Sequence, residues 1–370
     1  MYANNLKYAL ALNFLKGVGA INAKKLISYT GSFEDIFKLS KKDLSRIDGV
    51  GSVLANNLNN QFNDQKLWRK VDEELEFVVK HNIQYYIYKS KEYPFRLSQC
   101  EDAPLVLFSR GNINLNKQKI LSIVGTRNIT DYGKLVCENL IQEFANEDIL
   151  IVSGLAYGVD TWAHKLSVKN NLQTVGVLAH GLDRIYPATN KKLAQDMMIN
   201  GGVITEFPSN TNPDRENFPK RNRIIAGIAD ATLVIESASK GGSLITADIA
   251  NSYSRDVFAI PGRITDDKSA GCNYLIRTQQ AHAISSGEEL LELMNWKEEK
   301  QSKPQQSKLF VEYSVDEQKI ADCFTSKGPI HIESLFQQTG FNNAKASMVL
   351  LQMEMKGMIK SLPGKLYQLN

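Results

Sequence analysis

Residues 119–260 alternate between short apolar segments and segments with the periodicity of a helix. The apolar segments are rich in Val and Ile and show no polar alternation, which is typical of strands buried on both faces of a parallel sheet. Between two of them, Val136, Leu140 and Phe144 recur every four residues, as on the buried side of a helix. We therefore predict an α/β fold with an extended, Rossmann-like, doubly wound and mostly parallel sheet. The predicted strands are Lys119–Val124, Ile149–Ser153, Thr174–Ala179, Val203–Phe207, Ala231–Glu236 and Asp256–Ile260.

The length of 370 residues favours two or three domains. Hydrophobic residues make up 43% and charged residues 23%, a composition that excludes wholesale disorder. The sequence has no apolar run long enough to cross a bilayer, and its N-terminus does not resemble a signal peptide. The 4 cysteines stand far apart, without a CxxC pair, so we expect no disulfide framework and no zinc site. We expect a cytoplasmic protein that uses no metal or cofactor.

The first 75 residues carry an approximate repeat. Residues 15–19 and 47–51 each read hydrophobic residue, any residue, Gly-Val-Gly, and each precedes a helical segment. This pattern resembles a tandem helix-hairpin-helix unit, in which glycines let backbone amides at a helix N-terminus approach a phosphate. Such units also serve as packing modules, so both DNA contact and a purely structural role stay open.

The C-terminal part of the chain predicts a winged helix. Helices at 316–326, 332–338 and 344–356 are followed by two strands that a Pro-Gly turn connects. The third helix would lie in a major groove, but it offers only Lys345 and Lys356 as cations, so a role in protein contacts is an equal alternative. The predicted organisation is a helix-hairpin-helix domain at 1–75, an extended Rossmann-like domain at 76–296, a linker at 297–308 and a winged-helix domain at 309–370.

Ligands of open α/β sheets bind outside the carboxyl ends of the strands, so the segments that follow the predicted strands are the candidate site. None of these segments carries a G-x-G-x-x-G fingerprint, a P-loop, a G-x-S-x-G elbow or an HExxH motif. Asp160 and His164 share one helical face, a spacing more typical of a capping or packing pair than of a catalytic dyad. We expect no catalytic residues.

Residues 91–296 hold 21 Lys and Arg against 23 Asp and Glu, so a polyanion site there needs a local concentration of cations. Residues 215–223 provide one, with four cations and one acid. Arg127, Lys191 and Lys240 follow predicted strands. Together these residues can hold phosphates, with no evident nucleophile or metal cage.

Six motifs, in this order and spacing, resemble the DNA-processing protein A (DprA, also called Smf) family: VGTRNITDYG, SGLAYGVDTWAH, GLDRIYPATN, FPKRNRIIAG, GGSLITADIA and FAIPG. The resemblance runs from about Tyr93 to about Trp296. It implies a non-catalytic protein that binds single-stranded DNA without sequence preference and loads the RecA recombinase during natural transformation, displacing single-strand-binding protein. It also implies an extended Rossmann domain, often with a helical N-terminal and a winged-helix C-terminal extension.

The resemblance also implies roles for single positions. Arg127 matches the arginine of the family's Gly-Ser/Thr-Arg turn, and Phe218 matches a phenylalanine that contacts a base. Arg215 matches a cation that is lysine in relatives, and a further family lysine matches Lys191 or Lys192 approximately. Arginine keeps the charge and adds bidentate geometry toward a phosphate.

Sequence-independent binding of a single strand needs cations along the phosphates and an aromatic face for the bases. The basic segment around Phe218 offers both, if the fold gathers them. Arg221 and Arg223 have an alternative, because they could instead pair internally with Asp230 or Glu236. The predicted DNA-binding residues are Arg127, Asn128, Lys191, Arg215, Phe218, Lys220, Arg221, Arg223 and Lys240.

Two other functions stay open. The turn at 241–247 resembles the PGGxGTxxE turn of Rossmann-type nucleotide phosphoribohydrolases, but Asp248 is a carboxylate of the wrong type and register for their glutamate. The other alternative is a protein-interaction scaffold that does not bind DNA.

The resemblance implies a homodimer formed through the Rossmann domain. A predicted helix at 271–280 and a last strand at 282–285 would lie at a sheet edge, and an apolar edge needs cover. We expect the dimer face at Leu275, Ile276 and Ile284, although apolar helix residues can also point into their own domain. The expected partners are thus single-stranded DNA, RecA, single-strand-binding protein and a second copy of the chain, with no membrane.

Overall fold

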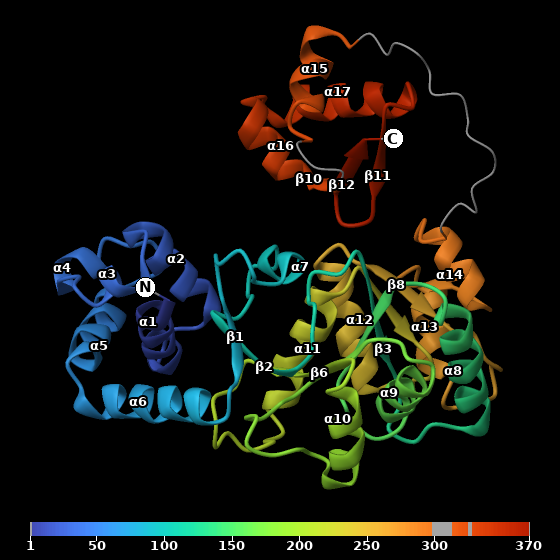
Figure 1. Ribbon diagram of the computed structural model, residues 1–370, viewed down its shortest axis with the longest axis horizontal. Coiled ribbons are helices and arrows are strands. Elements are labelled where there is room, and N and C mark those ends of the chain that lie inside the picture. Colours follow the sequence, from blue (N-terminus) through green and yellow to red (C-terminus); the bar gives the residue numbers. More distant parts are fainter. Residues whose placement is uncertain (1, 298–312, 325–327, 370) are drawn as a thin grey trace. The chain divides into compact units, whose positions relative to one another are not determined.

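The computed structural model describes residues 2–297, 313–324 and 328–369. The chain forms two compact units, Met1–Ser285 and Ser286–Asn370 (Figure 1). Of the predicted linker at 297–308, all but Lys297 lies outside the described residues. The bounds that we predict for the domains remain a proposal.

Unit 1 contains a sheet that has nine strands among the described residues, in the order β1-β2-β6-β5-β4-β3-β7-β8-β9. Along this order, all neighbours from β6 through β3 to β9 pair in parallel. At the other side of β6, β2 pairs antiparallel with β6, and β1 pairs antiparallel with β2. The predicted fold class is confirmed. The strands are β1 Gln84–Ile87, β2 Val106–Gly111, β3 Lys119–Val124, β4 Ile149–Ser153, β5 Thr174–Val177, β6 Gly201–Thr205, β7 Ala231–Val234, β8 Asp256–Ala259 and β9 His282–Ala283.

The six predicted strands are all present as β3 to β8: β3 and β4 have the predicted ends, and the ends of the other four differ by at most two residues. Helices cover both faces of the sheet, as the doubly wound pattern requires. On one face, the apolar side chains of the sheet, Val152 and Val177 among them, pack against α7, α11, α12 and α13. The helices α8, α9 and α10 lie on the other face. These helices are α7 Phe95–Ser98, α8 Asp131–Phe144, α9 Val159–Lys169, α10 Lys191–Met197, α11 Asn217–Ile228, α12 Gly242–Ser252 and α13 Ala270–Arg277.

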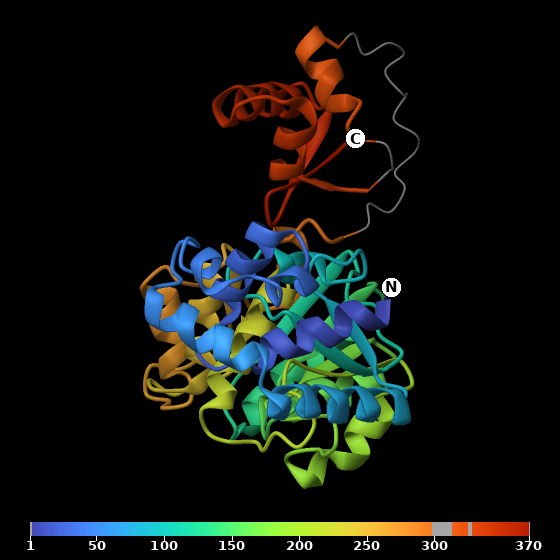
Figure 2. The ribbon, with the colours of Figure 1, turned by 90° about the vertical axis from the view of Figure 1, so that its left-hand side faces the viewer.

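The N-terminal part of unit 1 is helical and lies beside the β1 edge of the sheet (Figures 1 and 2). The predicted repeat is present as two helices that begin directly after Gly19 and Gly51. In each repeat the first glycine of the turn, Gly17 or Gly49, has a positive φ of 86° or 82°, which glycine adopts without steric cost. The helices are α1 Tyr2–Phe14, α2 Ala20–Thr30, α3 Phe33–Ile36, α4 Lys41–Leu44, α5 Ser52–Phe62 and α6 Gln65–Lys80.

The helical part and the sheet share one hydrophobic core. Leu10, Leu26 and Leu58 belong to the same buried cluster as Leu178 and Val203. The ammonium of Lys24 adds polar contacts, because it donates to the carbonyls of Cys100 and Glu101 at 2.7 and 2.9 Å. Burial lowers the pKa of Lys24 to about 8. The two parts therefore fold as one body.

Unit 2 has the order of a winged helix: α15 Val315–Ala321, β10 Ile330–His331, α16 Ile332–Thr339, α17 Asn343–Met355, β11 Ile359–Leu362 and β12 Leu366–Leu369. A further helix, α14 Gly287–Leu293, precedes them. Ile320, Leu335 and Leu350 belong to the buried core of unit 2. The winged-helix prediction is confirmed, although it missed β10 and extended the first helix to Ser326, which lies outside the described residues. None of the helices described in either unit has the length and apolar character to cross a bilayer.

Candidate nucleic-acid interface

The loops that follow β3, β4 and β7 interlock at the carboxyl edge of the sheet. The chain leaves β3 toward β4 on one side and later returns to the other side as β7, so this is the point at which open α/β sheets bind ligands. The amide of Thr126 donates to the carbonyl of Glu236 at 2.7 Å, and the amide of Val159 donates to the carbonyl of Thr126 at 3.1 Å. The three loops therefore form one rigid floor.

Gly158 makes this close approach possible. Its φ is +77°, and a Cβ at this position would lie 2.1 Å from the carbonyl oxygen of Thr126. Any side chain here would separate the β4 loop from the β3 loop. Gly158 thus allows the β4 loop to pack directly against the β3 loop.

Glu236 occupies the place where a dinucleotide phosphate binds in other sheets of this type. Its carboxylate accepts hydrogen bonds from the amide of Thr130, at 2.9 Å, and from the Thr130 hydroxyl, next to the first turn of α8. A Cβ on Gly133 would lie 2.5 Å from a Glu236 carboxylate oxygen, so the space above this helix start is filled. The helix N-terminus that would attract a phosphate already faces a carboxylate of the same chain.

Arg127 and Phe218 meet above this floor, although 91 residues separate them in the sequence. Arg127 is exposed on the β3 loop, and Phe218 is half-buried in the first turn of α11. The guanidinium carbon of Arg127 lies 5.5 Å from the centroid of the Phe218 ring, within cation–π range. Two predicted residues of different type, one cationic and one aromatic, are thus adjacent at the carboxyl edge.

Arg221 supports the same ring from inside the protein. It is 4% exposed, its guanidinium carbon lies 5.9 Å from the Phe218 centroid, and it donates to the carbonyls of Gly154 and Val177 at 2.5 and 2.6 Å. Burial lowers its pKa to about 10, despite the nearby Asp160. The prediction that Arg221 contacts DNA does not fit this burial, because its donors face carbonyl groups of the protein.

Arg223 is also used internally. It donates to the carboxylate of Glu206 and to the carbonyl of Asp102, and its side chain is 15% exposed. The internal alternative was right in kind but wrong in its partners, because Asp230 pairs with Arg96 at 2.5 Å and Glu236 binds Thr130. These contacts of Arg223 fit the internal alternative, in which it holds α11, better than the predicted DNA contact.

The remaining predicted residues are exposed, in the segments that follow the strands. Asn128 follows Arg127, Arg215 and Lys220 flank Phe218, Lys191 begins α10, and Lys240 follows β7. Because α10 and α11 run antiparallel to the strands, their first turns lie at the same carboxyl edge. The fold thus places these side chains along one edge of the sheet.

Two tyrosines at this edge were missed by the sequence prediction. Tyr157 follows β4 and Tyr186 follows β5, and each is 48% exposed. The ring centroids of Tyr186 and Phe218 are 6.2 Å apart. Both tyrosines stand in the motifs after the strands, where an exposed aromatic residue is a signal for base stacking.

Asp160 and His164 do not form a dyad. The Asp160 carboxylate accepts from the amides of Gly154 and Ala156 at 3.0 and 3.3 Å, and so shapes the β4 loop. His164 is fully buried, its Nδ1 lies 2.7 Å from the hydroxyl of Thr174, and burial lowers its pKa to about 3. The interpretation as a capping and packing pair is confirmed. Within the described ranges, His, Cys, Asp and Glu form no group that could hold a metal ion.

The predicted dimer face is partly buried. Leu275 and Ile284 are 0% and 1% exposed, so neither can form an interface. Leu275 lies on the side of α13 that packs in the hydrophobic core. Ile276 is half-buried, and the edge position predicted for the last strand is confirmed as β9. Of the three predicted residues, only Ile276 remains available to a partner.

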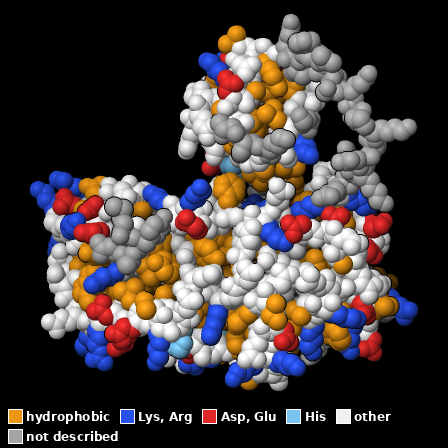
Figure 3. Space-filling view, in the orientation of Figure 1, with side chains coloured by type: hydrophobic (Ala, Val, Ile, Leu, Met, Phe, Trp, Pro, Cys, Tyr) orange, Lys and Arg blue, Asp and Glu red, His pale blue; other side chains and the backbone are white. Residues whose placement is uncertain are grey.

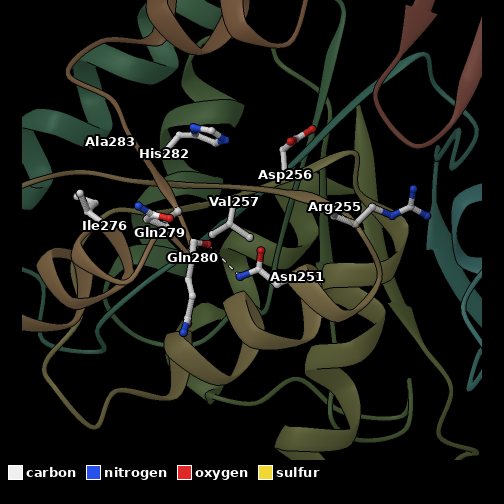
Figure 4. A pocket seen from close by; sticks show the side chains of 10 residues that line it. Asn251, Arg255, Asp256, Val257, Ile276, Gln279, Gln280, His282 and Ala283 are labelled. Carbon is white, nitrogen blue, oxygen red and sulfur yellow. Dashed lines mark hydrogen bonds between the residues drawn. The ribbon is translucent and has the colours of Figure 1, made fainter. Parts of the chain in front are cut away.

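A hollow of about 460 Å³ lies beside Ile276, at the amino ends of β8 and β9 (Figure 4). Asn251 donates to the carbonyl of Gln280 at 2.9 Å across it, as the dashed line in Figure 4 marks. Asp256 and His282 begin the two strands. The hollow is thus at the opposite end of the strands from Arg127.

The surface carries no single basic field on the side shown in Figure 3, where Lys and Arg are interspersed with Asp and Glu.

Comparison with known proteins identifies relatives over most of the chain. A family model described as DNA recombination-mediator protein A matches residues 84–295, and one described as DprA winged helix domain matches residues 301–365. The DNA processing protein DprA of Bacillus subtilis is 43% identical over 204 residues, which are 55% of this chain and 68% of that protein. Protein Smf of Escherichia coli is 34% identical over 290 residues, 74% of each chain.

Solved structures agree with this result. The DNA processing protein A of Streptococcus pneumoniae superposes with a TM-score of 0.65 at 31% identity, covering 79% of this chain and 97% of that one. The Helicobacter pylori protein, whose structure is described as showing a unique single-stranded DNA binding mode, has a TM-score of 0.52 at 28% identity and covers 57% of this chain and 96% of that one.

Proposed function

This chain belongs to the DNA recombination-mediator protein A family, also named DprA or Smf, and on that basis we propose that it binds single-stranded DNA without sequence preference. We further propose that it loads the RecA recombinase onto the bound strand during natural transformation and recombination. In this proposal the carboxyl edge of the sheet holds the strand.

The observation that carries the proposal is the contact between Arg127 and Phe218. A strand that is bound without regard to sequence needs a cation for a phosphate and an aromatic face for a base, close enough to serve one nucleotide. Arg127 and Phe218 offer that pair, and Arg215 and Lys220 add exposed cations beside the ring. Tyr186 adds a second aromatic ring at the same place.

We propose that this protein is not an enzyme. Asp160 and His164 make internal hydrogen bonds, and Glu236 fills the space above α8 in which a nucleotide phosphate would bind. These residues support binding rather than turnover, because none of them presents an acid, a base or a nucleophile to a ligand at the edge.

The test is a titration of fluorescein-labelled oligo-dT with the full chain, read by anisotropy at several salt concentrations. Phosphate contacts release counterions, so the logarithm of the association constant should fall linearly with the logarithm of salt, by about 0.7 per contact. Oligo-dA and a mixed sequence should bind with similar affinity. No binding at low salt would refute the proposal and favour the protein-interaction scaffold.

A nucleotide phosphoribohydrolase is the competing enzyme. Asp248 is exposed on α12, in the segment that resembles the turn of those enzymes. Incubation with AMP and related nucleotides should release no free base. Release that is lost in Asp248→Asn would refute the non-enzymatic assignment.

The proposed assembly is a homodimer, with RecA and single-strand-binding protein as further partners. Two copies would present two carboxyl edges to one strand, which raises the apparent affinity for a long strand without any new contact. The face we favour is at α13 and β9, where Ile276 is half-buried beside the open edge of the sheet.

A further inference from the structure

The helical N-terminal part of unit 1 reaches the candidate DNA site through one buried carboxylate. Glu74 of α6 is 4% exposed and meets Ser209, in the loop of residues 206–216 that connects β6 to α11. The amide of Ser209 donates to both carboxylate oxygens of Glu74, at 3.0 Å each, and the Ser209 hydroxyl donates to one of them at 2.5 Å.

A carboxylate is an unexpected residue at this position of α6. The buried residues of the helix are Leu67, Val71, Glu74 and Val78, a spacing that forms one stripe along the helix. Burial raises the pKa of Glu74, as expected for a charge withdrawn from water, and Arg69 of the same helix pairs with Glu73 instead. A leucine at position 74 would continue the apolar stripe without this cost of burial.

The loop that Glu74 holds is fixed again on its other side. The amide of Asn210 donates to the carboxylate of Asp183 at 2.9 Å, and Arg184 donates to the side-chain oxygen of Asn212 at 2.5 Å. The side chain of Asn217 then donates to the carbonyl of Asn212 at 3.1 Å. Asn217 is the first residue of α11 and directly precedes Phe218.

We propose that Glu74 is a positioning residue for DNA binding, which holds the 206–216 loop so that Arg215 and Phe218 are presented to the strand. The inference rests on the proposed function and deepens it, because it gives the helical part of the chain a role in presenting the side chains that bind the strand. Glu74 itself touches no nucleotide. It acts by keeping the loop in its binding conformation.

The physical reason is a shift of population. Without the Glu74 carboxylate, Ser209 loses three hydrogen bonds, and the loop gains conformations in which Phe218 and Arg215 are misplaced. The apparent dissociation constant rises in inverse proportion to the fraction of molecules in the competent conformation. A loop that is competent about one tenth of the time weakens binding about tenfold.

The test compares Glu74→Leu with Glu76→Leu in the full chain. Both substitutions remove one negative charge from α6, but Glu76 is exposed whereas Glu74 is buried, so it serves as the matched control. We expect Glu74→Leu to keep or raise the melting temperature, to weaken oligo-dT binding about tenfold and to leave the salt slope unchanged. Glu76→Leu should keep the wild-type affinity.

Two further measurements separate positioning from a merely structural role. Amide hydrogen exchange of residues 207–216 should be faster in Glu74→Leu than in wild type, both without DNA. Adding Ser209→Ala to Glu74→Leu should weaken binding no further, because the two side chains act through one contact. Should Glu74→Leu fail to fold, Glu74→Gln keeps the shape and part of the hydrogen bonding, and should show a smaller loss in both measurements.

The outcomes are distinguishable. Wild-type oligo-dT affinity in a folded Glu74→Leu variant, or unchanged exchange in its loop, would overturn this inference alone. A wild-type chain that binds no oligo-dT would overturn the proposed function, while faster exchange in the variant would still support the hold of Glu74 on the loop.

Discussion

Two arginines approach the same aromatic ring in this protein and have opposite environments. Arg127 is exposed and its guanidinium lies over Phe218, whereas Arg221 is buried below and bound to two carbonyls. Only the first can exchange its contact with water for a contact with phosphate. In the proposed site, burial rather than charge therefore distinguishes the arginine that is available to DNA from the one that is not.

Replacement of Arg127 tests the exposed member of this pair. Arg127→Ala should weaken oligo-dT binding several-fold and reduce the steepness of the log–log salt dependence by about 0.7, because one phosphate contact is lost. The measurement is the anisotropy titration at several salt concentrations.

The matched control is Arg110→Ala. Arg110 is exposed next to the last residue of β2, which runs antiparallel to β6 and so ends away from the carboxyl edge. Arg184 is unsuitable as a control, because it binds Asp183 and Asn212 in the site. Equal effects of Arg127→Ala and Arg110→Ala would argue against the carboxyl edge as the DNA site.

Phe218→Leu should act differently from the loss of a charge. Removal of the ring should reduce affinity by about 1–3 kcal/mol, the contribution of one stacked base, with little change in the salt slope. Melting temperature and affinity should be measured on the same preparation. A lower melting temperature with unchanged affinity per folded molecule would show that Phe218 is only a packing residue.

At the scale of a residue, the sequence could predict which types of side chain gather at the edge, but not which of them are buried. Arg127 and Phe218 follow from the position of their motifs and from the family resemblance. Arg221 and Arg223 share the same motif, and only the geometry of α11 shows that their donors face Gly154 and Glu206. Tyr186 was missed because its proximity to Phe218 depends on the loop after β5.

At the scale of elements, α9 is joined to β5 by a buried histidine that should make stability depend on pH. His164 has a pKa of about 3 in the folded protein, against 6.5 for an ordinary histidine. The unfolded chain therefore binds a proton that the folded chain does not, and stability is lost as pH falls below about 6.5. At pH 5.5 this one group should lower the free energy of unfolding by about 1.4 kcal/mol relative to pH 7.5.

The measurement is urea unfolding at pH 7.5 and pH 5.5 for wild type, His164→Asn and His81→Asn. His164→Asn should lose this part of the pH dependence, whereas His81→Asn, at an exposed histidine, should keep it. Buried carboxylates such as Asp230 and Glu206 have raised pKa values and act in the opposite direction, but all three proteins share them. An identical pH dependence in wild type and His164→Asn would contradict the assignment.

Element prediction from the sequence worked best where the pattern was strongest. The buried strands β3 to β8 are continuous apolar segments. The helix α8 has apolar residues at every fourth position, which mark its buried side. The strands β1 and β2 were missed, because β1 is a four-residue edge strand with Tyr85 and Tyr86 only half-buried, and β2 pairs antiparallel outside the strand–helix alternation. Edge strands carry weak patterns because only one side of them is paired.

For the whole molecule, we propose a dimer. Light scattering at micromolar concentration should give the mass of two chains for wild type and of one chain for Ile276→Glu. Ile245→Glu is the matched control, because Ile245 is 45% exposed near the start of α12, six residues before Asn251, which lies beside Ile276, and the substitution should leave the dimer intact. A folded Ile276→Glu variant that stays dimeric would refute this face, and a monomeric wild type would refute the dimer.

We propose that single-stranded DNA lies on the carboxyl edge of the sheet, against Phe218. The most direct measurement is photocrosslinking of the full chain to oligo-dT that carries 5-iododeoxyuridine, a base that reacts with aromatic side chains against which it stacks, followed by mapping of the modified peptides by mass spectrometry. This arrangement predicts crosslinks at Phe218 and at Tyr186, and the crosslink at position 218 should be lost in Phe218→Leu. Crosslinks confined to α17 of the winged helix or to the helix-hairpin-helix turns at 15–19 and 47–51 would contradict it.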